Sequence, residues 1–274
     1  MPGRPPIPTG LGLGSLRDPA TSGRSTLHAE LLREAARHPG EAVDPFAVAE
    51  TFRHYILDRN IVGSVRRGAG GKEYIHRYKA YYVHAMRDPI TSAAGRFGLP
   101  AVLVAGVVYN EVGGADLIKP AVFLLRELLS GSSDADRTSV GPASLQPRRA
   151  FAVLGYDPAK VDHLIRTDVV QALIHNHAFA IYVCAAHLAE IRERFFPGRT
   201  ANELDGEAVA VLGARYNQGL DVPEERLRRD LSYGRRILDR EKLLAKLLGE
   251  APVAEPDWSE PLGDAFGRIK GLFR

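Results

Sequence analysis

Apolar residues recur at spacings of three and four along most of the chain, which is the period of an α-helix that buries one face. The clearest series runs through residues 168–196 and predicts one long helix there. The alternation of a half-buried β-strand, bounded by hairpin turns, is hard to find. The pattern therefore predicts an all-α fold. The apolar face of the long helix comprises Val170, Leu173, Ile174, His177, Ile181, Cys184, Leu188, Ile191 and Phe195.

A second segment, residues 100–109, is apolar on all sides, so we expect it to be buried whatever its conformation. A short run rich in valine also fits a core strand, because periodicity alone does not separate the two. Pro100 at its start and the pair Gly113-Gly114 beyond its end favour a buried helix.

Proline and glycine mark where other helices begin and end. Asp-Pro pairs combine an N-cap residue with a proline of the first turn, and glycine is common just past a helix end. Residues 223–249 are expected to form a charged amphipathic helix or helix pair. We expect helix starts at Asp44-Pro45, Asp88-Pro89, Asp157-Pro158, Pro100, Pro120, Pro147 and Pro223, and stops at Gly98, Gly113, Gly131 and Gly155.

The pattern divides the chain into three parts. Residues 1–26 are rich in proline and glycine and have no apolar period, which predicts a disordered arm. Residues 27–249 carry the helical pattern of one domain. Residues 250–274 restart with proline and are expected to form a C-terminal tail.

Composition narrows the function classes. The 274 residues include 36 Lys and Arg against 33 Asp and Glu, a net charge of +3 without the basic stripe of a nucleic-acid binder. The single cysteine, Cys184, forms no intramolecular disulfide. Residues 99–109 are too short to span a membrane. The N-terminal residues lack the apolar core of a signal peptide, so we expect synthesis in the cytoplasm.

Glu111 is the candidate catalytic residue. It lies at the end of the apolar run, where partial desolvation and the negative end of a helix dipole both favour a protonated carboxyl. A protonated carboxyl is what a general acid needs. On position alone, Glu111 also fits an ordinary surface glutamate at a helix end.

Three short motifs stand out along the chain. Residues 106–111 read Gly-Val-Val-Tyr-Asn-Glu, residues 138–147 read Thr-Ser-Val-Gly-Pro-Ala-Ser-Leu-Gln-Pro, and residues 214–219 read Ala-Arg-Tyr-Asn-Gln-Gly, with Ser-Tyr-Gly following at 232–234. These motifs resemble those of goose-type lysozymes and soluble lytic transglycosylases, which share a lysozyme-like helical fold. Their order also resembles the family, and the likeness covers residues 99–238. Ala143-Ser-Leu-Gln146 departs from the family's Gly-Leu-Met-Gln, and Arg215 stands where a small residue is usual.

The resemblance implies a role for each matching residue. Glu111 would act as acid and then as base, and Tyr216 would hydrogen-bond or orient its carboxyl. Asn217 would hold substrate or the cleft wall, while Ser139 and Gln146 would face the reacting sugar. Tyr216 also fits a buried helix-end tyrosine and Gln146 a plain helix start.

A second carboxylate would decide the chemistry. Asp116, Asp134 and Asp136 lie in the part of the chain where an aspartate would hold a water molecule on the far side of the sugar, although each also fits a solvated loop residue. Without such a partner, the sugar's own acetamido and 6-hydroxyl groups would complete the reaction, as in lytic transglycosylases. Hydrolase and transglycosylase both remain open.

No metal or cofactor is predicted. His175 and His177 are two residues apart, which points them to different faces of one helix, and His187 adds no convergent third ligand. His177 is therefore expected to be a core histidine.

The expected function is cleavage of the bond between N-acetylmuramic acid and N-acetylglucosamine in peptidoglycan strands, at the cell wall or in the periplasm. An antibacterial effector or an endolysin would fit, with a delivery or immunity protein as a candidate partner and no nucleic acid or membrane span. The alternatives are a catalytically silent wall-binding or assembly module and a chitin or chitosan hydrolase of the same fold.

Overall fold

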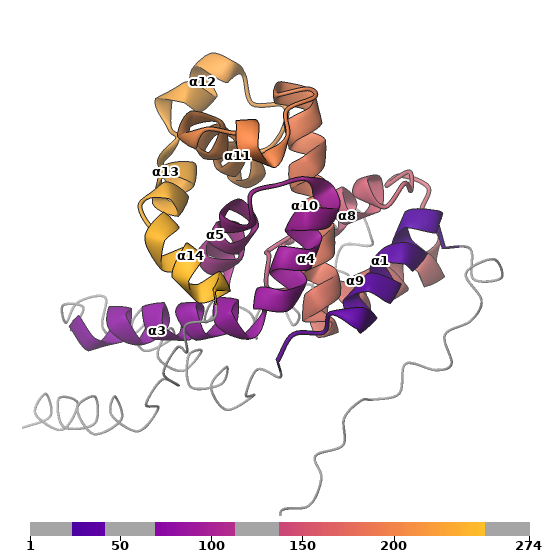
Figure 1. Ribbon diagram of the computed structural model, residues 1–274. Coiled ribbons are helices and arrows are strands. Elements are labelled where there is room, and N and C mark those ends of the chain that lie inside the picture. The colour runs from indigo at the N-terminus through magenta and orange to yellow at the C-terminus, as the bar shows by residue number, and fades with distance from the viewer. Residues whose placement is uncertain (1–23, 42–68, 113–136, 250–274) are drawn as a thin grey trace, which may run out of the picture.

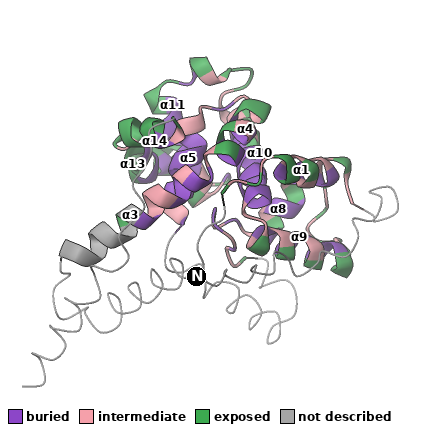
Figure 2. Cartoon of the chain, turned by 60° about the horizontal axis from the view of Figure 1, so that its bottom comes forward, coloured by how far each residue is buried: buried purple, intermediate pink, exposed green. Residues whose placement is uncertain are grey.

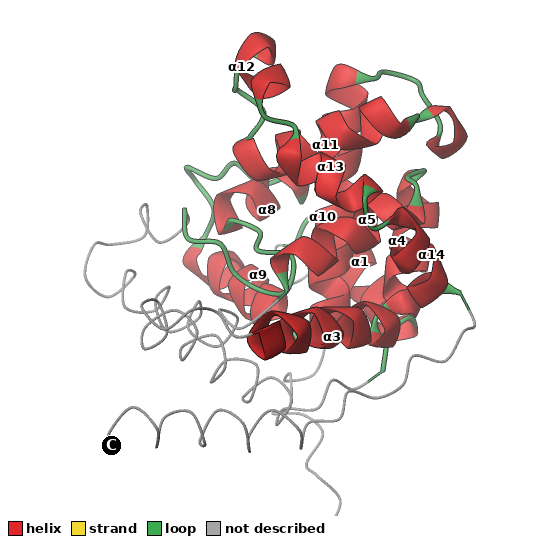
Figure 3. Ribbon diagram, turned by 90° about the vertical axis from the view of Figure 1, so that its left-hand side faces the viewer, coloured by secondary structure: helices red, strands yellow, loops and turns green. Residues whose placement is uncertain are grey.

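The computed structural model describes residues 24–41, 69–112 and 137–249, and all regular elements of these residues are helices (Figure 3). Within these ranges the all-α prediction is confirmed, and the β pairing is one isolated antiparallel bridge between Val140 and Leu145. The elements are α1 (Thr26–Arg37), α3 (Ala69–Ala85), α4 (Arg87–Phe97), α5 (Ala101–Glu111), α8 (Pro147–Val153), α9 (His163–His175), α10 (His177–Phe195), a 3-10 helix (Ala201–Glu203), α11 (Gly206–Gln218), α12 (Glu224–Arg229), α13 (Ser232–Leu238) and α14 (Glu241–Leu248).

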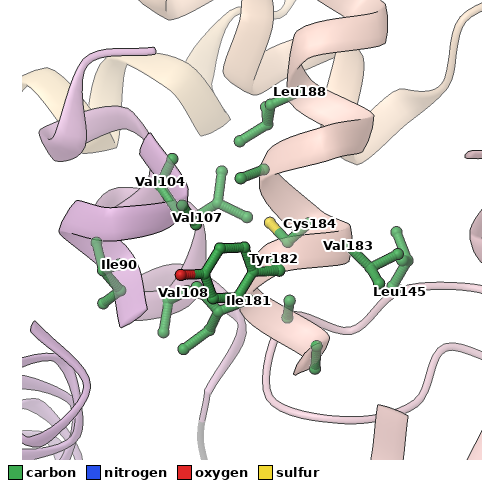
Figure 4. Packing of buried hydrophobic residues seen from close by; sticks show 14 of the residues in the cluster. Ile90, Val104, Val107, Val108, Leu145, Ile181, Tyr182, Val183, Cys184 and Leu188 are labelled. Carbon is green, nitrogen blue, oxygen red and sulfur yellow. The ribbon is translucent and has the colours of Figure 1, made fainter. Parts of the chain in front are cut away.

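Helix α10 is the centre of the fold (Figure 1). It contacts α1, α4, α5, α8, α9 and α11, and every residue from 178 to 188 is buried. Figure 2 shows the same burial along α5, which is covered by neighbouring helices on its sides. In the core between them, Tyr182 and Cys184 of α10 face Val104 and Val107 of α5 (Figure 4).

The single long helix predicted over residues 168–196 is wrong, because the chain breaks at Asn176. Helices α9 and α10 meet there at an angle of 106°. The Asn176 side chain accepts a hydrogen bond from the backbone N–H of Phe179 at 2.9 Å and so caps α10. The apolar period continues through this bend because α9 and α10 both bury apolar side chains, so the sequence pattern alone does not reveal where one helix ends and the next begins. No single helix in the described ranges is long and apolar enough to span a membrane; α9 and α10 reach that length only together, across the bend.

The two histidines beside the corner consequently lie on different helices. His175 ends α9 and His177 begins α10. The His177 ring packs against the Tyr82 ring with centroids 5.6 Å apart, and burial lowers the pKa of His177. In the described part of the chain, no three His, Cys, Asp or Glu side chains are close enough to hold a metal ion.

Residues 101–111 form a helix, so the strand alternative for this segment is excluded. Helix α5 begins after Pro100 and ends at Glu111, ahead of the predicted Gly113-Gly114 stop, which lies outside the described residues. The ammonium group of Lys79 donates to the carbonyl oxygens of Tyr109 and Asn110, both at 2.9 Å. A cation at this negative end of the helix stabilises its last turn.

The expected helix boundaries have mixed outcomes. Pro147 and Pro223 open α8 and α12, while Gly98 ends α4 in the left-handed conformation and Gly155 follows α8. Asp88-Pro89 lies in the first turn of α4, which begins at Arg87. Residues 223–249 contain three short helices rather than one or two. Asp44-Pro45, Pro120 and Gly131 lie outside the described residues.

The predicted helix start at Asp157-Pro158 is wrong. The Asp157 side chain accepts a hydrogen bond from the backbone N–H of Ala159 and forms a turn. Helix α9 begins later, where the Asp162 side chain accepts from the backbone N–H of Leu164 at 2.8 Å. Both aspartates bond a backbone N–H two residues on, and the sequence does not show which of them starts a helix.

The first described residues join the predicted arm to the helical region. Ser25 caps α1 by accepting from the backbone N–H of His28, and Arg24 forms two hydrogen bonds with Asp168 of α9. His28 is fully buried against Phe179, and burial lowers its pKa to about 4. Residues 24–26 of the predicted arm are thus packed on the domain. The rest of the arm and residues 250–274 lie outside the described residues.

Glycine allows helix α13 to pack at backbone distance from its neighbours. A Cβ atom on Gly213 of α11 would lie 2.8 Å from the Cα atom of Gly234, and one on Gly234 would overlap the backbone of Ala210. A Cβ atom on Gly106 of α5 would overlap the side chain of Ile237. These close approaches place α13 directly against both α11 and α5.

We predict that Gly234→Ala destabilises the protein by roughly 1–3 kcal/mol, because the added methyl group has no space and the two helices must separate. Urea unfolding measures the change. The matched control is Gly95→Ala in the exposed part of α4, where no atom lies within 4 Å of the added methyl group. The control should gain about 0.5–1 kcal/mol from the higher helix propensity of alanine. Equal stability of Gly234→Ala and wild type would contradict the close packing of α13.

Candidate functional site

A cleft opens where the end of α5 meets the loop before α8 and the end of α11. It contains all five residues predicted to be catalytic or substrate-binding, which come from three distant segments of the chain. The lining residues are Glu111, Ser139, Ser144, Leu145, Gln146, Arg148, Arg149, His187, Tyr216, Asn217, Gln218 and Gly219.

Glu111 projects from the last turn of α5 and is half-buried. Its Oε1 atom accepts a hydrogen bond from the hydroxyl group of Tyr233 at 2.8 Å. Within the described residues this is the only hydrogen bond to the carboxyl group, and Glu111 lines the cleft. One oxygen of the carboxyl group is therefore held by Tyr233.

Tyr233 is almost completely buried on α13. Burial, reinforced by the charge of Glu111, raises the pKa of Tyr233 well above its usual value. The hydroxyl group therefore remains a neutral donor. The side chain of Asn110 donates to the backbone carbonyl of Tyr233 at 3.4 Å, which ties α13 to the turn of α5 that carries Glu111.

Tyr216 does not make the hydrogen bond to Glu111 that we expected of it. Its hydroxyl group donates to the carbonyl oxygen of Ala143 at 2.6 Å, and its ring packs against His187 with centroids 5.7 Å apart. Burial raises the pKa of Tyr216 well above its usual value, so it too is a neutral donor. Tyr233 takes the expected place beside the carboxyl; the Ser-Tyr-Gly sequence at 232–234 belonged to the resemblance but carried no predicted role.

The loop before α8 is a tight turn held by its own backbone. Val140 and Leu145 exchange N–H···O hydrogen bonds of 2.9 and 3.1 Å, and Ser144 adopts a left-handed conformation with φ of 48°. A Cβ atom on Gly141 would overlap the backbone carbonyl of Leu173, so only glycine fits against α9. The turn buries its apolar side chains and leaves Ser139 and Gln146 at its two ends, both in the cleft.

Gln146 lines the cleft at the start of α8. It is the N-cap residue of α8, although its side chain makes no capping hydrogen bond. Its Oε1 atom instead accepts from Nε of Arg148 at 2.8 Å. Asn217 is exposed near the end of α11, and the neighbouring Gln218 donates to the carbonyl oxygen of Asp230 at 2.7 Å. Amide side chains thus stand on both sides of the cleft.

Arg215, the departure from the family motif, lies away from the cleft. It is buried, and its guanidinium group stacks 4.1 Å from the centre of the Phe195 ring. It donates to the carbonyl oxygens of Leu220 and Val222. Arg215 therefore stabilises the turn after α11 and leaves the cleft side of that helix to Tyr216 and Asn217.

The buried thiol of Cys184 and the candidate second carboxylates also bear on the chemistry of the cleft. Cys184 is buried behind Tyr216, and burial raises the pKa of its thiol to about 12, which keeps it protonated and unreactive. Glu111 is the only carboxylate among the described lining residues. The candidate second carboxylates Asp116, Asp134 and Asp136 lie outside the described residues.

Comparison of the chain with protein families, with characterised proteins and with solved structures finds no match.

We predict that Tyr216→Phe lowers the free energy of unfolding by about 1–3 kcal/mol, because it leaves the buried carbonyl of Ala143 without its donor. Urea unfolding gives the change, and amide hydrogen exchange at Val140 and Leu145 reports loosening of the turn. Asn217→Ala is the control, since that neighbouring side chain is exposed and should change stability by less than about 0.5 kcal/mol. Unchanged stability and exchange in Tyr216→Phe would contradict a structural role for its hydroxyl group.

Proposed function

We propose that this chain has a lysozyme-like fold and cleaves the glycan strands of peptidoglycan, with Glu111 as the catalytic acid. The observation that carries the proposal is the convergence of the three family-like segments on one cleft. They are far apart in sequence, so only the tertiary fold brings them to the same cleft. A half-buried carboxyl group stands among them with one oxygen bound to a neutral donor.

In the proposed reaction, the protonated carboxyl of Glu111 gives its proton to the glycosidic oxygen as the bond to the anomeric carbon breaks. Tyr233 fixes the rotation of the carboxyl through Oε1, so that the other oxygen is directed to the substrate. When the sugar's own 6-hydroxyl group attacks, the Glu111 carboxylate accepts its proton; when water held by a second carboxylate attacks, that second carboxylate accepts the proton. Ser139, Gln146 and Asn217 offer the hydroxyl and amide groups that bind sugar hydroxyls.

The attacking group decides the product. A water molecule held by a second carboxylate would give hydrolysis, whereas the sugar's own 6-hydroxyl group would give an anhydro end without net addition of water. The proposal covers both reactions, because each begins with proton donation by Glu111. We further propose that the protein acts at the cell wall, where its substrate lies.

We predict that Glu111→Gln abolishes cleavage of purified peptidoglycan while the protein stays folded, because the amide is nearly isosteric but donates no acidic proton. Loss of general acid catalysis lowers the rate roughly a hundredfold to ten-thousandfold. Release of soluble fragments measures the rate, and mass spectrometry of the fragments separates hydrolysis from formation of anhydro ends.

Glu225→Gln provides the charge-matched control, because Glu225 is exposed on α12 and pairs with Arg229 away from the cleft. It should cleave at the wild-type rate. A Glu111→Gln protein that digests peptidoglycan nearly as fast as wild type would refute the assignment of the acid. A folded wild-type protein that releases nothing would refute the proposed cleavage and favour a wall-binding module.

We predict that Tyr233→Phe lowers kcat roughly tenfold and leaves KM nearly unchanged, because Tyr233 positions Glu111 and does not itself line the cleft. A hydrogen bond to a neutral carboxyl group contributes about 0.5–1.5 kcal/mol net, and the upper end of that range corresponds to about a tenfold change in rate. Kinetics on soluble glycan fragments, with the folded fraction measured in parallel, provide the test. A fall in kcat explained wholly by unfolded protein would show that Tyr233 only supports the packing of α13.

A further inference from the structure

Two arginines line one side of the cleft beside Gln146. Arg148 is exposed and Arg149 is half-buried, and both project from the first turn of α8. The Nε atom of Arg148 is bound to Gln146, as described above, so its position is set by the cleft wall. Against these two cations, Glu111 is the one carboxylate among the described lining residues. This side of the cleft therefore carries excess positive charge.

Among the described residues, no counter-ion is bound to the guanidinium group of Arg149. That group makes no hydrogen bond or ion pair in these ranges, although its charge contributes to lowering the pKa of Glu190. The main cause of that lowering is the hydrogen bond from His187, which lies 3.0 Å from the Glu190 carboxylate. Glu190 is thus already engaged by His187.

The end of α11 leaves space for this guanidinium group. A Cβ atom on Gly219 would lie 3.1 Å from Nη2 of Arg149, so any larger residue would push the arginine aside. Gly219 also has φ of 105°, a conformation that other residues rarely adopt. The turn therefore leaves space for the guanidinium group beside the cleft.

We propose that Arg149, with Arg148 beside it, binds a carboxylate group of the glycan substrate and makes the cleft selective for anionic strands. This inference rests on the proposed function and specifies its substrate class. A guanidinium group presents parallel N–H donors that match the two oxygens of a carboxylate. Peptidoglycan carries carboxylates on its lactyl and peptide substituents, whereas chitin carries none and chitosan is cationic. The two arginines thus distinguish wall glycans from neutral or basic polymers of similar sugars.

The test measures binding in a Glu111→Gln background, so that the ligand is not consumed. Soluble peptidoglycan fragments with free carboxylates are titrated against the protein and compared with the same fragments after conversion of the carboxylates to neutral amides. Chitin oligomers of similar length provide a second neutral ligand. Adding Arg149→Gln should weaken binding of the free-carboxylate fragments roughly tenfold or more and leave binding of the neutral ligands unchanged.

Arg33→Gln is the charge-matched control, because Arg33 is exposed on α1 and does not line the cleft. Arg33→Gln should leave all affinities unchanged. Arg149→Lys should retain only part of the preference for free-carboxylate fragments, since lysine keeps the positive charge but lacks the parallel N–H donors of a guanidinium group. Thermal melting confirms that each variant is folded.

Equal weakening by Arg33→Gln and Arg149→Gln would overturn the proposal, as would equal affinity of the parent for free and amidated fragments or no binding at all. Rapid cleavage of chitin oligomers by the wild-type protein would overturn the selectivity while leaving glycan cleavage intact. Carboxylate-selective binding by a protein that cleaves nothing would support the arginine site and refute the catalytic role.

Discussion

The backbone contact between α11 and α13 sets the position of the hydroxyl group that holds Glu111. Tyr233 adjoins Gly234, and Gly234 lies against the backbone of α11 with no space for a side chain. On the other side, Ile237 fills the space above Gly106 of α5. Since α5 carries Glu111 five residues beyond Gly106, the same packing that joins the three helices also fixes the distance between the tyrosine and the glutamate.

The cleft lies on a tightly packed apolar core, and most of its polar side chains project from the ends of helices. Helices α5 and α10 are buried for most of their length and pack tightly in the core (Figure 4). Most polar residues of the cleft come from the end of α5, from the turn around Val140 and Leu145 with the start of α8, and from the end of α11, while His187 comes from α10. Helix ends are where backbone groups also become available, so polar side chains there are readily satisfied. Rigid positioning of this kind suits a site whose chemistry depends on the orientation of one carboxyl group.

Tyr233 and Tyr216 each hold a different part of the site through a hydrogen bond. Tyr233 holds the carboxyl group, while Tyr216 holds the turn that carries Ser139 and Gln146. Both hydroxyl groups are kept neutral by burial, so both donate to fixed oxygen acceptors. The turn that carries Ser139 and Gln146 and the carboxyl group of Glu111 are consequently anchored by separate contacts.

The sequence by itself determined the helical class, the buried helix over residues 101–111, the boundaries at Pro147, Pro223 and Gly98, and five of the residues that line the cleft. Each of these depends on local period, on the backbone limits of proline and glycine, or on a short motif. The tertiary structure alone decided the corner at Asn176, because a helix buried on all sides and a buried bend share the same apolar composition. It also decided that Tyr233, and not Tyr216, bonds Glu111. That choice depends on how closely α13 approaches α5 and α11, and such a distance between segments far apart in the chain leaves no periodic signal in the sequence.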